Sequence, residues 1–247
     1  MLSQAEKGGV QNTIQNCVTV LQNDPVLADS IRLNLLSERI DIVKPMGWQR
    51  SGPTLTDTDM MYILRRMEKY GLYSEKRVSA AIRIVANENH YHPIRDYLND
   101  LKWDGTERIS HALHRFLGAA EDELTAEALK IFLLGAIKRV FHPGCKFKMM
   151  LCLVGGQGAG KSSFFRLLAI KDEWFSDDLR RMDDDNVFRK LQGHWIMEMS
   201  EMIATANAKS IEEIKSFLSK QKETYKIPYE THPADRLRQC VFAGTTN

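Results

Sequence analysis

Apolar residues recur every three or four positions along most of the chain before residue 142, and this spacing predicts amphipathic helices. The segments that show the pattern are residues 13–23, 56–71, 74–89, 92–103, 108–117 and 124–141. Residues 32–44 are ambiguous, because their spaced leucines and isoleucines fit either a short hairpin or a helix. We therefore expect a mostly helical N-terminal domain over residues 1–105.

The pattern changes further along, where short apolar runs alternate with polar or glycine-containing segments. Residues 147–154, 193–201 and 240–243 contain such runs, which are typical of buried strands. Helical spacing returns after the first run and again in residues 207–220. This alternation of strands and helices predicts an α/β domain over residues 106–247.

A glycine-rich loop follows the first of these predicted strands. Its sequence from Gly155, Gly-Gly-Gln-Gly-Ala-Gly-Lys-Ser, fits the phosphate-binding pattern G-x-x-x-x-G-K-[ST] without a mismatch. Glycines let successive backbone N–H groups turn inward around phosphate oxygens, and the next helix adds its positive N-terminal end. The expected nucleotide contacts are Gly155, Gly156, Gln157, Gly158, Ala159, Gly160, Lys161, Ser162 and Ser163. The alternative is a glycine-rich turn that binds nothing.

Catalytic roles follow from the loop and from the acids at the end of the second predicted strand. Lys161 is expected to reach the β- and γ-phosphates of ATP, and the Ser162 hydroxyl is expected to bind Mg²⁺. Of the two acids, we expect Glu198 to hold Mg²⁺ and Glu201 to act as the base that orients the attacking water, although the roles fit in the other order as well. The usual adjacent Asp-Glu pair is absent, and solvated glutamates at a strand edge are the alternative.

Polar and basic residues near the end of the chain are further candidates. Asn247, with Thr246 behind it, follows the last apolar run and is expected to contact the γ-phosphate or the attacking water. Arg236 or Arg238 fits an arginine finger offered to a neighbouring subunit, or an ordinary surface arginine.

Two stretches carry basic residues in patterns that fit nucleic-acid contacts. Lysines from Lys209 to Lys226 alternate with apolar residues near Tyr225 and Tyr229, which suits a channel for a single strand as well as a plain surface. Residues 56–89 fit a helix-turn-helix with basic side chains, or a pair of helices with a solvated basic face.

Composition narrows the class of protein. The chain is 43% hydrophobic and 27% charged, as in ordinary globular proteins, and its net charge of +2 means that any basic surface is local. The four cysteines have no C-x-x-C spacing, which indicates a reducing compartment. No apolar run approaches the roughly 18–20 residues that span a bilayer, and the first residues lack a signal-peptide core, so we expect a cytoplasmic protein without membrane contact.

Taken together, the motifs resemble those of the virulence-associated protein E family. These are P-loop ATPases of phages, plasmids and mobile islands, related to superfamily 3 helicases and often joined to a primase. The matching stretches are residues 92–98, 101–105, 143–147, 155–163, 191–195, 198–201, 215–218 and 241–247. The resemblance covers roughly residues 10–247. It implies an α/β P-loop NTPase core of the additional-strand type, as in AAA+ proteins, and ATP-driven work on DNA during replication of a mobile element. Single-stranded DNA is the partner that we expect.

The resemblance also bears on assembly and completeness. It implies a homo-oligomer, with a ring as the expected form, and it allows a primase as partner. The family continues beyond the Thr-Thr-Asn strand with further sheet and an arginine-bearing segment, whereas this chain stops at Asn247. We therefore expect a sheet that lacks a strand beside the loop strand. Two functions stay open: an ATP-hydrolysing, helicase-like replication protein, and a nucleotide-binding DNA-interaction module with weak or no hydrolysis. A small-molecule kinase would need a separate acceptor pocket with lid arginines, for which we find no pattern.

Overall fold

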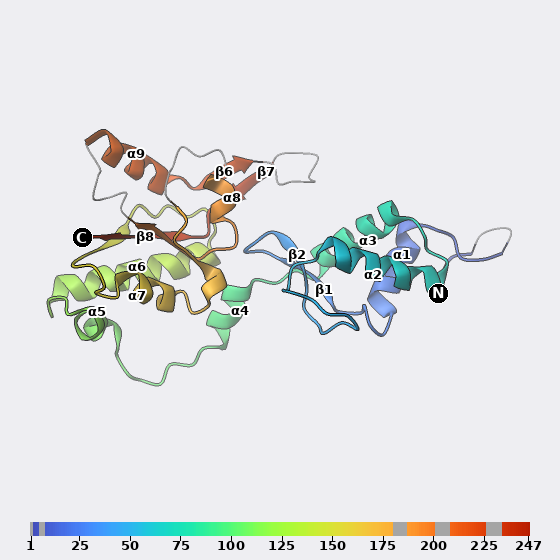
Figure 1. Cartoon of the computed structure of the whole chain (residues 1–247), viewed down its shortest axis with the longest axis horizontal. Helices are drawn as coiled ribbons and strands as arrows, with labels where there is room; N and C mark the ends of the chain where they lie inside the picture. The colour runs from blue at the N-terminus through green and yellow to red at the C-terminus, as the bar shows by residue number, and fades with distance from the viewer. Residues whose placement is uncertain (1, 5–7, 180–186, 201–207, 226–233) are drawn as a thin grey trace. The chain divides into compact units, whose positions relative to one another are not determined.

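The computed structural model describes residues 2–4, 8–179, 187–200, 208–225 and 234–247. The chain forms two compact units, Met1–Asp96 and Tyr97–Asn247 (Figure 1). The division lies upstream of the boundary expected after residue 105, within helix α4 (Pro93–Asp100). Tyr97 belongs with the second unit because its ring packs edge-on against that of Trp174, with 5.9 Å between the centroids.

The first unit combines helices with a short antiparallel hairpin. Its elements are α1 (Ile14–Asn23), β1 (Ile31–Asn34), β2 (Arg39–Ile42), α2 (Asp57–Met67), a 3-10 turn (Glu68–Tyr70) and α3 (Glu75–Glu88). The hairpin decides between the two structures that residues 32–44 allowed, with Ile31 paired to Ile42. Helix α3 packs mainly against α1 and β1 rather than against α2.

A buried acid fixes the start of α2 in this unit. Thr56 and Asp59 form a capping box, in which the Thr56 side chain accepts from the Asp59 N–H and the Asp59 carboxylate accepts from the Thr56 N–H. Burial raises the pKa of Asp59, but hydrogen bonds from Arg50, Trp48 and Thr56 outweigh that effect and hold the pKa well below its usual range. Asp59 therefore stays ionised and anchors the loop before α2.

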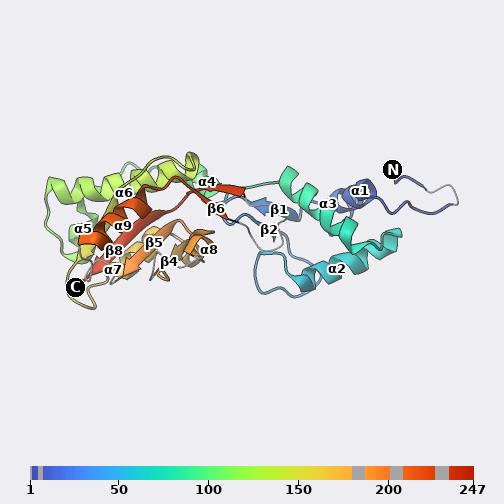
Figure 2. The same cartoon turned by 90° about the horizontal axis from the view of Figure 1, so that it is seen from above.

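A parallel sheet organises the second unit. Its strands are β3 (Met150–Val154), β4 (Phe175–Ser176), β5 (Ile196–Ser200) and β8 (Val241–Thr246), and their order is β3-β8-β5-β4. Every pairing in it is parallel, and Figure 2 shows β8, β5 and β4 in sequence. Strand β3, which leads into the glycine-rich loop, is therefore separated from β5 by β8.

Helices cover both faces of this sheet. They are α5 (Ile109–Leu117), α6 (Glu123–Phe141), α7 (Lys161–Leu168), α8 (Val187–Leu191) and α9 (Ala208–Ser219), joined by a 3-10 turn (Asp172–Trp174) and by a hairpin of β6 (Lys222–Tyr225) and β7 (Ala234–Leu237). Figure 1 shows α9 on one side of β8, and α6 and α7 on the other. In the part of the chain that the structure describes, no helix has the length and hydropathy that a membrane crossing requires.

Alternation along β5 decides which residue faces which layer. Met197 and Met199 belong to the core cluster that α9 completes with Ile214 and Phe217. Since successive side chains of a strand point to opposite faces, Glu198 points toward the layer that contains α7. The apolar strand predicted for residues 193–201 thus carries one buried carboxylate, which lies on the same side of the sheet as α7.

Replacing Gly135 with alanine is expected to lower the free energy of unfolding by about 1–3 kcal/mol, the usual effect of overpacking. A Cβ atom at this position of α6 would lie 2.2 Å from Phe147 Cζ. Phe147 precedes β3 in the chain, and its backbone carbonyl accepts a hydrogen bond from the buried guanidinium of Arg139. Urea unfolding measures the loss. The matched control is Gly52→Ala, whose Cβ meets nothing within 4 Å, and equal stabilities of the two variants would contradict this packing.

Candidate functional site

The loop between β3 and α7 depends on glycines with a left-handed backbone. Gly158 and Gly160 both have a φ of 81°, a region that side chains with a Cβ rarely adopt. Gly160 is also the N-cap of α7, which begins at Lys161. Because the first N–H groups of a helix have no acceptor within it, this end of α7 presents free donors to an anion.

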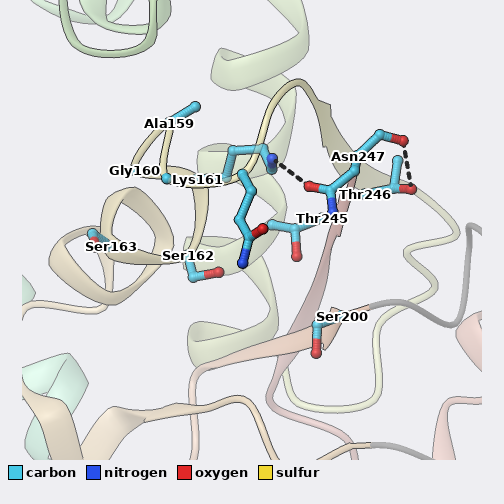
Figure 3. A pocket seen from close by; sticks show the side chains of 11 residues that line it. Ala159, Gly160, Lys161, Ser162, Ser163, Ser200, Thr245, Thr246 and Asn247 are labelled. Carbon is cyan, nitrogen blue, oxygen red and sulfur yellow. Dashed lines mark hydrogen bonds between the residues drawn. The ribbon is translucent and has the colours of Figure 1, made fainter.

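A cleft of about 420 Å³ opens beside this loop. It is lined by residues 157–163 of the loop and α7, by Ser200 at the end of β5, and by Thr245, Thr246 and Asn247 at the end of β8 (Figure 3). The cleft therefore lies at the carboxyl edge of the parallel sheet, which is where ligands bind in open α/β proteins. Gly155 and Gly156 do not line it, although the Gly155 N–H donates to Thr246 O at 3.2 Å and so attaches the loop to β8.

Lys161 is held beside the cleft by its own loop. Its Nζ atom donates to Gly155 O, to Gly156 O at 2.9 Å, and to Asn247 Oδ1 at 3.3 Å. Figure 3 shows the side chains of Lys161 and Asn247 turned toward each other. The structure thus brings together two residues that are 86 positions apart and that the sequence predicted for the same site.

Glu198 is the buried acid of the site, with no exposed surface. Its Oε1 atom accepts hydrogen bonds from Ser162 Oγ at 2.7 Å and from Thr245 Oγ1 at 2.5 Å. Its Oε2 atom is buried and has no hydrogen-bond partner among the described residues. A carboxylate oxygen without a partner beside a serine hydroxyl is a hard oxygen donor set, which fits Mg²⁺. The two predicted metal ligands are therefore adjacent.

Thr245 is the member of this group that the sequence did not single out. The prediction for the end of the chain named Asn247 and Thr246, whereas the side chain that contacts Glu198 belongs to Thr245. Strand alternation was the signal that could have found it: side chains two positions apart lie on the same side of an extended chain, and Thr245 is two positions before Asn247. The other predicted acid, Glu201, lies outside the described residues, so its role as the base stays a prediction.

Arg238 corrects one expectation from the sequence. Neither an arginine finger nor a surface arginine fits, because only 4% of Arg238 is exposed. Its guanidinium donates to Phe217 O and to the Glu223 carboxylate, and it lies 4.6 Å from the centre of the Phe217 ring. These contacts attach β7 to the end of α9, so the role of Arg238 is structural.

The basic stretch after β5 is only partly described. Lys215, Lys220 and Lys222 each lie within ion-pair distance of an acid, namely Glu212, Glu223 and Asp235. Tyr229 and Lys226, which were expected to contribute to a nucleic-acid channel, lie outside the described residues. In chain order the hairpin β6–β7 follows β5, which carries Glu198, and precedes β8.

Fold and site together define a mixed α/β protein with a glycine-loop cleft at the carboxyl edge of a parallel sheet. A family model for the virulence-associated protein E-like domain matches residues 98–247, more than half of the chain. The chain belongs to this family, as the motifs of its sequence indicated. None of the curated proteins matches it.

Solved structures with a similar fold include three of the C-terminal region of NrS-1. The A-form apo structure of that region covers 87% of this chain at 12% identity, with a TM-score of 0.51. The A-form apo structure of its residues 305–718 covers 96% at 13% identity with a TM-score of 0.51, and a further apo structure of the same residues covers 96% at 12% identity with a TM-score of 0.52. The chain spans 53%, 57% and 58% of the lengths of these structures, and at such identities the likeness concerns the fold.

Proposed function

We propose that the cleft binds ATP with Mg²⁺ and hydrolyses it to drive work on DNA, as a helicase-like replication protein of a phage or other mobile element. The observation that carries the proposal is the 2.7 Å hydrogen bond between Ser162 on α7 and Glu198 on β5. It joins the phosphate-loop pattern to a buried acid from a different strand. A glycine-rich turn that binds nothing would not account for a buried carboxylate beside it, so this contact favours a ligand site.

Strand order gives independent support for a P-loop core. Strand β8 lies between β3, which leads into the loop, and β5, which carries Glu198. This is the arrangement that names the additional-strand class of P-loop ATPases, to which the sequence resemblance assigned the chain. The end of β8 then brings Asn247 to the cleft, where it is placed to contact the γ-phosphate or the attacking water.

In this proposal each residue has a defined task. The N–H groups of the loop and of the first turn of α7 bind phosphate oxygens, and Lys161 moves from its carbonyl partners to the β- and γ-phosphates. Ser162 and Glu198 hold Mg²⁺, which neutralises charge on the phosphates when bound. Glu201 orients the water that attacks the γ-phosphate, and Asn247 steadies it. Hydrolysis is then mostly a matter of positioning and charge stabilisation.

Lys161 is the one side-chain cation of this set, and an arginine beside the γ-phosphate is missing from it among the described residues. Within the described residues no arginine lines the cleft. Charge on the γ-phosphate during transfer is commonly neutralised by an arginine finger, supplied in many cases by another subunit. We therefore propose that a second copy of the chain completes the site in a ring-shaped oligomer, and that single-stranded DNA and a primase are its partners during replication.

A second candidate function has its own observation. Strand β3 is at the edge of the described sheet, and Val154 at its end is 74% exposed. In the described sheet β3 is paired only with β8, so the strand that leads into the loop is supported on one side only. This favours a nucleotide-binding DNA-interaction module with weak or no hydrolysis as the alternative.

Single-stranded DNA is expected to raise the rate of ATP turnover by the wild-type chain, because binding and hydrolysis are coupled in a motor. Phosphate release at saturating ATP, measured with and without an oligonucleotide, tests this directly. ATP binding with no turnover in either condition would favour the alternative function. Turnover at one rate in both conditions would contradict the coupling to DNA.

A further inference from the structure

Two hydroxyl groups donate to the same oxygen of Glu198, and they differ in how firmly they are held. Ser162 is in the first turn of α7, next to the loop that has to close around phosphate. Thr245 is in β8, which is paired along both edges, with β3 on one side and β5 on the other. Thr245 itself is paired with Ser200 in β5, two residues beyond Glu198. The backbone of Thr245 is therefore fixed relative to that of Glu198.

Thr245 also connects the buried acid to the cleft. Glu198 does not line the cleft, whereas Thr245 and Ser162 do. Thr245 is only 6% exposed, so its hydroxyl has few partners to choose from, and its single proton is donated to Glu198 Oε1 at 2.5 Å.

We infer that Thr245 is a positioning residue for the metal site: its hydrogen bond to Oε1 holds the Glu198 carboxylate and thereby fixes the direction of Oε2, the oxygen that has no partner among the described residues. The inference rests on the proposed function, because it assigns Glu198 to Mg²⁺. If the Ser162 oxygen were to bind the metal, the hydrogen bond from Thr245 would remain to fix the rotamer of Glu198. Nothing in the loop pattern predicts this role, since Thr245 is in a strand 83 residues after Ser162.

The test is the Mg²⁺ dependence of ATP binding, measured with fluorescent ATP on the full chain. Thr245→Val keeps the shape of the side chain and removes the hydroxyl. It is expected to raise the Mg²⁺ concentration at half-saturation by about 10-fold or more, the usual effect of losing a group that orients a metal ligand. Thr245→Ser keeps the hydroxyl and is expected to behave as wild type. Binding measured in excess EDTA should be the same for all three proteins.

Each outcome decides one question. A Thr245→Val protein with the wild-type Mg²⁺ dependence would overturn the inference. A Thr245→Ser protein as impaired as Thr245→Val would overturn it too, because keeping the hydroxyl would then not be enough to keep the Mg²⁺ dependence. If Thr245→Val does not fold, Thr245→Ser and Thr245→Ala form a second pair that differs by one hydroxyl group. Wild-type protein whose ATP binding ignores Mg²⁺ would instead count against the proposed function.

Discussion

Replacing Lys161 with alanine is expected to lower ATP turnover at least about 100-fold, the range seen when one preorganised charge or donor is removed from a transition state. The ammonium group is the only side-chain cation among the described residues that line the cleft. During phosphoryl transfer, charge spreads over the oxygens of the γ-phosphate, and a cation fixed beside them stabilises that state more than the ground state. Alanine offers neither charge nor donor, and water in the cleft is a poor substitute.

A matched control separates this role from a general effect of losing a lysine. Lys171 lies after α7 and outside the cleft, and its Nζ is 3.9 Å from the Glu173 carboxylate. Lys171→Ala is expected to hydrolyse ATP at the wild-type rate. Steady-state phosphate release with both variants gives the comparison. Unchanged turnover by Lys161→Ala would remove the basis of the whole site assignment.

Replacing Glu198 with glutamine is expected to slow hydrolysis about 10- to 100-fold while ATP binding is largely retained. The amide has the shape of the carboxylate, and its oxygen still accepts from Ser162 and Thr245, so the packing around it is preserved. The negative charge that holds Mg²⁺ in place is lost, and the charge on the γ-phosphate is then less well neutralised.

Binding and turnover are measured separately for this variant. Loss of both would mean that ATP binding, and not only hydrolysis, depends on the metal that Glu198 holds, whereas wild-type rates would show that the buried acid is structural. The control is Glu212→Gln, an exposed acid of α9 whose partner is Lys215, and it is expected to change neither quantity.

Much of the second unit could be predicted because its motifs are local. The apolar run of β3, the loop and the start of α7 are consecutive in the chain, so the pattern and the structure differ only at the ends of the elements. The contacts of Lys161 with Asn247 and of Ser162 with Glu198 required more, namely that parallel strands end at the same edge of a sheet. That rule is general, and the acid-bearing strand and the last strand were recognisable from their apolar runs.

The contacts of buried polar residues could not be predicted from the pattern of apolar and polar positions. Arg139 is on a helix where arginine ordinarily faces solvent, yet it is fully buried and donates to Cys240 O at 2.8 Å and to Phe147 O at 2.9 Å. Arg238 is likewise enclosed by aromatic rings, and Thr245 finds an acid 47 residues before it in the chain. Partners so distant in sequence can be identified only when the pairing register of the strands is known.

The most direct test of the central claim is a calorimetric titration of the wild-type chain with ATP, in Mg²⁺ and again in excess EDTA. We expect one saturable site per chain with a dissociation constant below about 1 mM, in the range usual for enzyme substrates, and weaker binding when Mg²⁺ is removed. Lys161→Ala in the same titration should bind more weakly than wild type. No saturable binding of ATP by the wild-type chain in Mg²⁺ would contradict the account.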